Sequence, residues 1–367
     1  MRDFLKRYKI QMEILTPVFI GAGSELTKKE YIYDKENKYV WIPDKQHLIR
    51  DIYKRKLENK FEEYMLSQNE PLLNWMESVG YKEKEIQKLC SYSMDCSQAL
   101  ENLNHPIAIQ EFVKDAYGMP YIPGSSLKGA IRTALLGTKI LDNPRQYQSL
   151  KKEVIDCNPV MENGKPNKKY LVLQGKKAEV VAFHTIRATD KKEDAKNDEL
   201  KGIHISDSKP LKLQDLILCQ KIDLSMEQHK NALNILRESL RPKTVVEFEL
   251  TIDTSVSKLK KEDIERALQN TWNFYRNAYV KKFMPISEKD KGNLYLGGGC
   301  GFGTKTVIYE LLEERQRVRI VSQLMDIKFK KHRQDVRKGV SPRRLKCTNY
   351  KGAICEMGKC FVKIEEI

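Results

Sequence analysis

The sequence predicts an α+β fold, and three observations lead to this class. The chain has 367 residues, which fits two packed domains better than one small domain. Its residues are 40% hydrophobic and 32% charged, so it can bury a real core and is not disordered throughout. The last part of the chain alternates expected strands and helices, as in a small α+β domain with an antiparallel sheet. We therefore expect one domain over residues 1–238 and a second over 239–367.

Alternating polarity predicts the strands of the first half of the chain, and helical spacing of apolar residues predicts the helices between them. Asp44 is expected to cap the first helix, and more helix is expected over residues 70–103. Ser125 is expected to cap a later helix that buries Leu127 and Ile131. Strands are expected at residues 8–15, in a hairpin at 31–33 and 39–42, and in a second hairpin at 107–122.

The middle of the chain contains two stretches without a regular pattern. Residues 142–170 are rich in Asn, Pro and Lys. Residues 189–201 are almost wholly charged and are expected to form a solvated or disordered loop. A regular pattern then resumes. Strands are expected at residues 244–252, 293–296 and 361–365, and helices at 259–283 and 305–317.

The chain carries a large positive surplus. Lys and Arg total 66 against 50 for Asp and Glu, which gives a net charge of +16. Such a surplus on a folded protein favours a polyanionic partner, nucleic acid first and an anionic membrane surface second; a basic protein without such a partner stays open. No apolar run is long enough for a membrane span or a signal peptide, so we expect a cytoplasmic protein whose eight cysteines are reduced.

The sharpest motif is the glycine cluster GGGCGFGTKT at residues 297–306. Glycine lets the backbone adopt positive φ and approach a ligand closely, and the loop amides beside a helix start can bind an anion. Lysine adds a charge there, and phenylalanine adds a face on which a base can stack. The candidate contacts in this segment are Gly297, Gly298, Gly299, Gly301, Phe302, Gly303, Thr304 and Lys305.

Two enzymatic interpretations of the glycine cluster fit the sequence poorly. A Walker A loop needs GxxxxGK[ST], and here Lys305 comes one place too late. A dinucleotide-binding GxGxxG fails as well, because Thr304 stands where the third glycine is required. A tight turn without any ligand stays open as the plainer alternative.

The second motif is PYIPGSSLKGAIRTALL at residues 120–136, a loop that leads into a helix. Ser125 and Ser126 stand at the expected helix start, directly after Gly124. Lys128 and Arg132 are four apart and share the face opposite the buried stripe. Two hydroxyls and two cations at a helix N-terminus suit a phosphate backbone, while an ordinary capped amphipathic helix explains the same pattern.

No set of residues indicates catalysis or metal binding. The six histidines form no HxH or HExxH pattern, and no Ser-His-Asp set or spaced carboxylate pair stands out. Cys347, Cys355 and Cys360 are irregularly spaced and are expected to pack as small apolar residues rather than to bind zinc. Asp207 in HISDSKP is expected to cap a turn. We therefore expect no cofactor and no metal.

Together the segments TPVFIGAGSE, DAYGMPYIPGSSLKGAIRTALL, HISDSKP and LYLGGGCGFGTKT make the chain similar to the repeat-associated (RAMP) proteins of CRISPR effector complexes. Their order and spacing most resemble the subunit at the crRNA 3′ end of the type III-A (Csm) complex. The resemblance implies two ferredoxin-like (RRM-like) domains with helical and loop insertions. It also implies a subunit that caps a filament of RAMP subunits, contacts the 3′ part of the guide RNA and supports its maturation.

The resemblance implies several partners: the crRNA, other RAMP subunits and small helical subunits of the complex, and a host nuclease that trims the RNA. No membrane partner is expected. The early motif often carries histidine after TPV, and here Phe19 stands in its place, which favours RNA binding over RNA cleavage. In the same loop, Gly21, Gly23 and Ser24 form a weaker third candidate element.

We therefore predict an RNA-binding subunit without catalytic residues. Three alternatives remain open. The chain could be a metal-independent ribonuclease with a histidine base, or the filament-forming sister subunit that cuts target RNA. It could also be a scaffold that contacts only protein.

Overall fold

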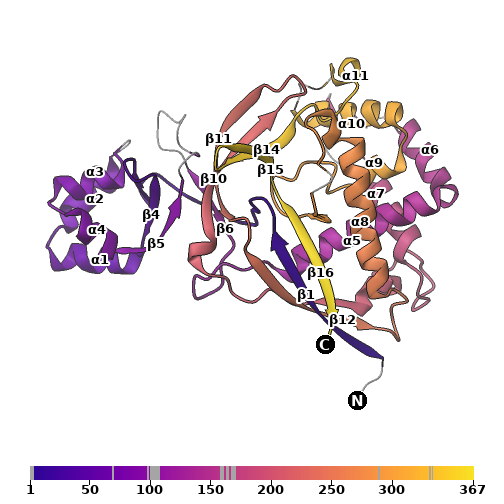
Figure 1. Cartoon of the computed structure of the whole chain (residues 1–367), viewed down its shortest axis with the longest axis horizontal. Coiled ribbons are helices and arrows are strands. Elements are labelled where there is room, and N and C mark those ends of the chain that lie inside the picture. The colour runs from indigo at the N-terminus through magenta and orange to yellow at the C-terminus, as the bar shows by residue number, and fades with distance from the viewer. Residues whose placement is uncertain are drawn as a thin grey trace.

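The computed structural model describes residues 4–67, 70–96, 99, 108–157, 161–162, 165–166, 171–287, 290–329, 332 and 334–367. Two curled β-sheets form its centre, and most of the helices gather on one side of them (Figure 1). The predicted α+β class is confirmed. The ferredoxin-like topology of the domains stays a prediction.

The first sheet is antiparallel throughout and joins the two ends of the chain. Its strand order is β13-β16-β1-β12-β9, so the first strand lies between the last strand and β12 (Figure 1). Ile10, Met12 and Ile14 are fully buried and alternate with more exposed residues, as the period of a strand requires. The strands are β1 (Leu5–Ile14), β9 (Ile203–Ile205), β12 (Val245–Asp253), β13 (Leu294–Tyr295) and β16 (Lys359–Glu366).

The second sheet has the strand order β2-β6-β11-β10-β5-β4-β3, and a hairpin of β14 and β15 joins it at β10. Both sheets therefore take strands from each side of the predicted boundary at residues 238 and 239, which falls within β11; the division into domains stays a prediction. The strands are β2 (Gly21–Leu26), β3 (Ile32–Asp34), β4 (Tyr39–Pro43), β5 (Cys90–Asp95), β6 (Ile109–Phe112), β10 (Leu216–Leu224), β11 (Lys230–Leu240), β14 (Leu345–Tyr350) and β15 (Ala353–Glu356).

A buried carboxylate ties three strands of the second sheet together. The side chain of Glu238 is fully buried, and it accepts hydrogen bonds from the Tyr92 hydroxyl, from the Phe112 amide at 2.9 Å and from Lys114 Nζ at 2.5 Å. A buried charge needs such partners, because it has lost its water. β5, β6 and β11 are thereby held in one register.

Two long helices pack against each other beside the first sheet (Figure 1). They are α5 (Gly124–Asp142) and α8 (Lys261–Ala278). The predicted apolar stripe of α8 is confirmed, since Ile264, Leu268 and Trp272 are all buried. Further helices complete this side. They are α6 (Gln148–Asp156), α7 (Val172–Phe183), α9 (Ile308–Leu311), α10 (Glu314–Phe329) and α11 (Asp335–Lys338).

A helical insertion between β4 and β5 extends from the second sheet, away from α5 and α8 (Figure 1). It has its own core, in which Tyr64 stacks on Trp75 with ring centroids 5.2 Å apart. Asp44 caps its first helix as predicted, because its Oδ1 accepts from the His47 amide at 2.9 Å. The insertion consists of α1 (Lys45–Lys54), α2 (Glu58–Leu66), α3 (Leu72–Ser78) and α4 (Glu83–Lys88).

One local prediction is wrong. Residues 90–95, expected to be helical, form β5, because they pair with β4 in the second sheet; the expected helix at 97–98 and 100–103 lies outside the described residues. Within the stretch 142–170, whose sequence shows no regular pattern, residues 148–156 form α6. Every helix within the described ranges is too short or too polar to cross a membrane.

The charged run 189–201 is also more ordered than expected. Asn197 is buried, and its side-chain oxygen accepts from the amides of Ala188 and Thr189 at 2.8 and 3.0 Å. Glu199 is buried too, and it accepts from Lys139 Nζ at 2.8 Å. The run folds because specific partners replace the water around these polar groups, which composition alone does not reveal.

Candidate nucleic-acid interface

Three segments that the sequence nominated separately meet at one groove of about 480 Å³, named here the central groove. One wall is the start of β2, the second is the first two turns of α5, and the third is the glycine loop, residues 297–306. Its lining residues are Ile20, Gly21, Ser126, Gly129, Ala130, Thr133, Tyr295, Leu296, Gly297, Gly298, Thr304 and Lys305.

The glycine loop is held by Phe19. The Gly298 amide donates to the Phe19 carbonyl oxygen at 2.6 Å. A Cβ atom on Gly297 would lie 2.3 Å from that oxygen, and one on Gly298 would lie 2.7 Å from Cδ1 of the Phe19 ring. Gly297 also has φ of +91°, where side chains are strained. These two glycines are therefore required by the approach of the loop to the protein's own chain.

A cationic side chain, that of Arg237, lies beneath the glycine loop. The Arg237 guanidinium stacks on the Phe19 ring at 4.9 Å, and its Nε donates to Gln110 Oε1 at 2.9 Å. A Cβ atom on Gly299 would lie 2.9 Å from Arg237 Nη1. Burial lowers the pKa of Arg237, but a guanidinium stays charged at neutral pH. The loop therefore folds over a positive charge, which makes its outer side attractive to an anion.

The start of α5 is capped from outside the helix. The Gly124 amide donates to Asp207 Oδ1 at 2.8 Å, so Asp207, expected to cap a turn of its own, instead caps the start of α5. The prediction that Ser125 caps this helix is wrong: α5 begins at Gly124, and Ser125 is exposed. A Cβ atom on Gly124 would lie 2.3 Å from the Ser206 carbonyl oxygen, so this glycine serves packing.

Lys128 and Arg132 face a neighbouring segment of the chain. Lys128 Nζ donates to two carbonyl oxygens in residues 200–203, at 2.6 and 2.9 Å, and burial lowers its pKa. Arg132 forms ion pairs with Asp198 at 2.7 Å and with Glu179 at 2.9 Å. The charges of both side chains thus hold residues 198–203 against α5. Their contact with RNA stays a prediction.

Lys305 is the nominated cation that is free to meet a ligand. It is exposed at the rim of the central groove, and within the described part of the chain its side chain has no hydrogen bond or ion pair. Other nominated residues lie elsewhere. Gly23 and Ser24 are exposed on β2 outside the groove lining. Gly303, within the glycine loop, is packed against α8, where a Cβ atom would be 2.7 Å from the Tyr275 ring.

The remaining two residues of the glycine loop also lie off the central groove. Gly301 has φ of +92°, and a Cβ atom there would lie 3.5 Å from the Tyr275 hydroxyl. Phe302 is half-buried and lines an adjoining cavity. The structure therefore brings Gly21, Ser126 and the two ends of the glycine loop together at the groove, and it separates them from the middle of the loop, residues 299–303.

Sequence reasoning missed Gly129, which lies in the wall that α5 gives to the groove. An ideal Cβ atom there meets nothing within 4 Å, so neither packing nor φ requires glycine. Glycine inside a helix costs about 1 kcal/mol relative to alanine. An isolated glycine in the strong helical pattern SLKGAIR was therefore the signal for an open surface.

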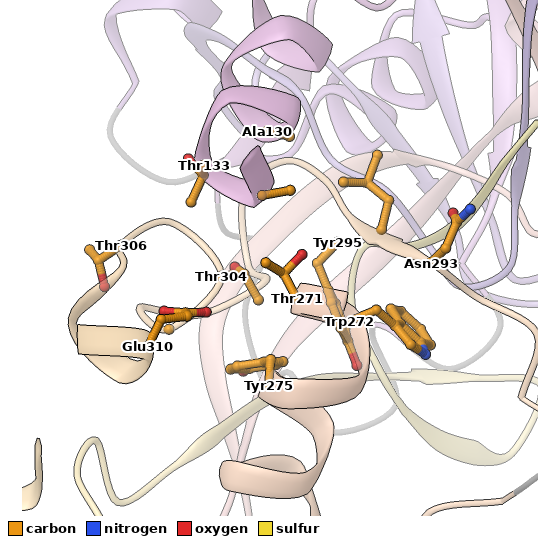
Figure 2. Close-up of a pocket in the computed structure, with 13 residues that line it drawn as sticks. Ala130, Thr133, Thr271, Trp272, Tyr275, Asn293, Tyr295, Thr304, Thr306 and Glu310 are labelled. Carbon is orange, nitrogen blue, oxygen red and sulfur yellow. The ribbon is translucent and has the colours of Figure 1, made fainter. Parts of the chain in front are cut away.

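A small polar pocket of about 40 Å³ lies behind the groove, between α5, α8 and the end of the glycine loop (Figure 2). The Glu310 carboxyl projects into it, and its Oε2 atom is buried without a hydrogen-bond partner among the described residues. Burial raises the pKa of Glu310 to about 8, although Arg317 opposes the shift. Four threonine hydroxyls also line the pocket, but each of them donates to a backbone carbonyl oxygen and not to the Glu310 carboxyl. They are those of Thr133, Thr271, Thr304 and Thr306.

The described residues bring together no group of three His, Cys, Asp or Glu side chains that could hold a metal ion. Cys347 and Cys360 are fully buried, and burial raises the pKa of Cys355 to about 12. The predicted packing role of the two buried cysteines is confirmed.

Comparison with known proteins shows the family to which the chain belongs. The RAMP superfamily matches residues 11–306. A Streptococcus thermophilus protein named CRISPR system Cms protein Csm5 is 31% identical over 323 residues, which cover 84% of this chain and 82% of that protein. A protein of the same name from Mycobacterium tuberculosis H37Rv is 27% identical over 99% of both chains. The chain therefore belongs to the RAMP superfamily and, within it, to the Csm5 family.

Solved structures agree with this fold. A chain of a Csm-crRNA-target RNA ternary complex from a type III-A CRISPR-Cas system superposes with a TM-score of 0.66 and 18% identity, over 98% of this chain and 100% of that chain. The crystal structure of T. onnurineus Csm5 gives 0.60 and 17%, over 96% and 99%.

The close approach of the glycine loop to Phe19 predicts that Gly297→Ala is strongly destabilising. The substitution adds a positive-φ penalty and a steric clash, together roughly 2–5 kcal/mol of unfolding free energy. Gly129→Ala is the matched control and should stabilise the protein by about 0.5–1 kcal/mol, because its Cβ atom meets open space in a helix. Urea denaturation measures both. Equal effects of the two alanines would contradict the assigned loop geometry.

The buried Glu310 carboxyl predicts a pH-dependent penalty. Its pKa is near 8 in the folded protein and 4.5 ordinarily. Between these values the unfolded chain releases the proton and the folded protein keeps it. Stability therefore falls as the pH rises, by at most roughly 1.4 kcal/mol per pH unit, and levels off above about 8. Glu310→Gln lacks this titration. Urea denaturation should therefore show the unfolding free energy of Glu310→Gln rising relative to that of the wild type between pH 5 and pH 8. Parallel curves would contradict the prediction.

Proposed function

We propose that this protein is a non-catalytic, crRNA-binding subunit at the 3′ end of a type III-A CRISPR (Csm) interference complex, where it supports crRNA maturation and antiviral defence. The observation that carries the proposal is the central groove. Gly21, Ser126 and the glycine loop meet there, with Lys305 free at the rim. Relatives that bear the Csm5 name support the assignment to the complex.

The groove suits a single-stranded RNA backbone. Its lining includes glycine backbone and small side chains, which let a phosphate come close. Lys305 lies at the rim and Arg237 beneath the loop, so the local charge is positive. Contacts of this kind carry no base information, so binding through the groove should depend weakly on RNA sequence.

A binding role is favoured over cleavage by what lines the groove. Among its described lining residues there is no histidine, carboxylate or cysteine that could act as a base or nucleophile. At the position where the resemblance suggested a histidine, the Phe19 ring is buried beneath the loop. We propose that other RAMP subunits and small helical subunits are neighbours in the complex, and that a separate host nuclease trims the crRNA.

A direct test is the affinity of the purified protein for a labelled guide RNA at several salt concentrations, with the same samples inspected on gels. Salt-sensitive binding with intact RNA is the expected result. Cleavage that persists after removal of contaminating nucleases would favour the ribonuclease alternative. Absence of salt-sensitive binding would overturn the assignment of the groove.

Gly129 offers a pair of variants that test the groove itself. Gly129→Glu places a negative charge in the groove, and Gly129→Lys places a positive one at the same position; neither meets a clash at Cβ. We expect Gly129→Glu to bind guide RNA more weakly than Gly129→Lys, by on the order of tenfold at low salt. Thermal unfolding checks that both variants fold. Equal affinities would place the RNA elsewhere.

Lys305→Ala should lower the salt dependence of RNA binding. Loss of one phosphate contact on single-stranded RNA reduces the slope of log affinity against log salt by about 0.7. Lys54→Ala is the control, because this lysine is exposed on the helical insertion far from the groove. A slope that Lys305→Ala leaves unchanged would remove this lysine from the interface.

A further inference from the structure

A second cavity adjoins the central groove on the side of α6 and α7. Its volume is about 270 Å³, somewhat below the roughly 300–1,000 Å³ of sites for drug-sized ligands. The ring of Phe302, from the glycine loop, forms part of its wall. The apolar walls include Leu136, Leu150, Val154, Leu171, Ala178 and Leu324.

The cavity and the groove are continuous. Thr133 and Lys305 line both, so Lys305 stands at the passage from one to the other. A phosphate held by Lys305 in the groove would therefore place the attached nucleoside beside the mouth of the cavity. The two spaces differ in chemistry, since glycines and small residues make up much of the groove lining, while larger apolar side chains make up much of the cavity lining.

Polar and charged groups interrupt the apolar lining, among them Arg132 and Glu179, which form an ion pair at 2.9 Å. Gln174 contributes an amide, and its Nε2 already donates to Glu153 Oε1 at 3.1 Å. Thr306 contributes a hydroxyl whose hydrogen goes to the Phe302 carbonyl oxygen at 3.3 Å. A flat ring with apolar faces and a polar edge fits such a lining. Nucleobases have this character, and unstacked bases of single-stranded RNA are commonly bound between apolar and aromatic side chains.

We propose that this cavity receives one nucleobase that turns out of the bound RNA, while the phosphate of that nucleotide is held at Lys305. The inference rests on the proposed RNA-binding function and adds a base-binding site to it. An apolar side chain of a neighbouring subunit is the competing occupant. The base is favoured because the passage to the groove carries the free cation, which an apolar side chain does not need.

Gly175 allows the cavity to be filled without strain. It lies on α7 in the cavity lining, and an ideal Cβ atom there meets nothing within 4 Å. Gly175→Leu should therefore fold and occlude the cavity, while Gly175→Ala leaves most of it open. Ala178→Leu, one turn along the same helix, fills the cavity independently if Gly175→Leu does not fold.

The experiment measures the affinity of the full chain for a labelled guide RNA and for the same RNA with one abasic nucleotide at each position in turn. In the wild type and in Gly175→Ala, we expect one position at which base removal weakens binding by roughly tenfold. In Gly175→Leu that position should lose its effect, while the salt dependence set by the groove remains.

Several results would overturn the base pocket. One is a flat abasic profile in a wild type that still binds RNA with salt dependence; in that case the proposed function stands and the base pocket fails. Another is a profile that Gly175→Leu leaves unchanged. An unchanged profile combined with impaired assembly of Gly175→Leu into the complex would assign the cavity to a protein side chain. Loss of all salt-sensitive binding in the wild type would instead reject the proposed function, and the base pocket with it.

Discussion

The contact between the glycine loop and Phe19 is the constraint on which the central groove depends. The Gly298 amide donates to the Phe19 carbonyl oxygen, and the Phe19 ring lies between Gly298, Gly21 and the Arg237 guanidinium. Because side chains on the loop would collide with this residue, glycine is needed where the two segments meet. The contact joins a segment from each end of the chain, as the pairing of β1 with β16 does in the neighbouring sheet. The groove therefore forms only when segments far apart in the sequence have come together.

The positively charged side chains of the two motifs differ in whether they already have partners within the protein. Lys128 and Arg132 look like an RNA-binding pair by charge alone, yet each is engaged within the protein. Charges that are paired or bonded internally stabilise the scaffold and add little to the attraction of a distant phosphate. Lys305 differs, because its ammonium group is exposed and unengaged in the described structure. Local geometry, and not net charge, therefore decides which cations are free to meet an anionic ligand.

Periodic patterns in the sequence predicted the helices and strands, but they did not predict the long-range contacts between them. The stripe of α8 follows from the 3.6-residue period, and β1 and β16 follow from alternation, but nothing local indicates that these two strands pair. Lys128 and Arg132 were correctly placed on one face of α5, whereas their partners in residues 198–203 come from a run that looks disordered by composition. Sequence therefore nominated the glycine loop and α5, and only the fold could show which of their polar groups already have partners within the protein.

Two helical glycines offer the strongest local argument that the hollows beside α5 serve a ligand. Gly129 and Gly175 lie within helices, have no neighbour that would exclude a methyl group, and do not need positive φ. Alanine at either position would stabilise its helix by roughly 0.5–1 kcal/mol. Gly297 and Gly298 differ, because packing against Phe19 accounts for them completely. The two positions line the groove and the adjoining cavity, respectively, and the missing side chains leave room there for the proposed ligand.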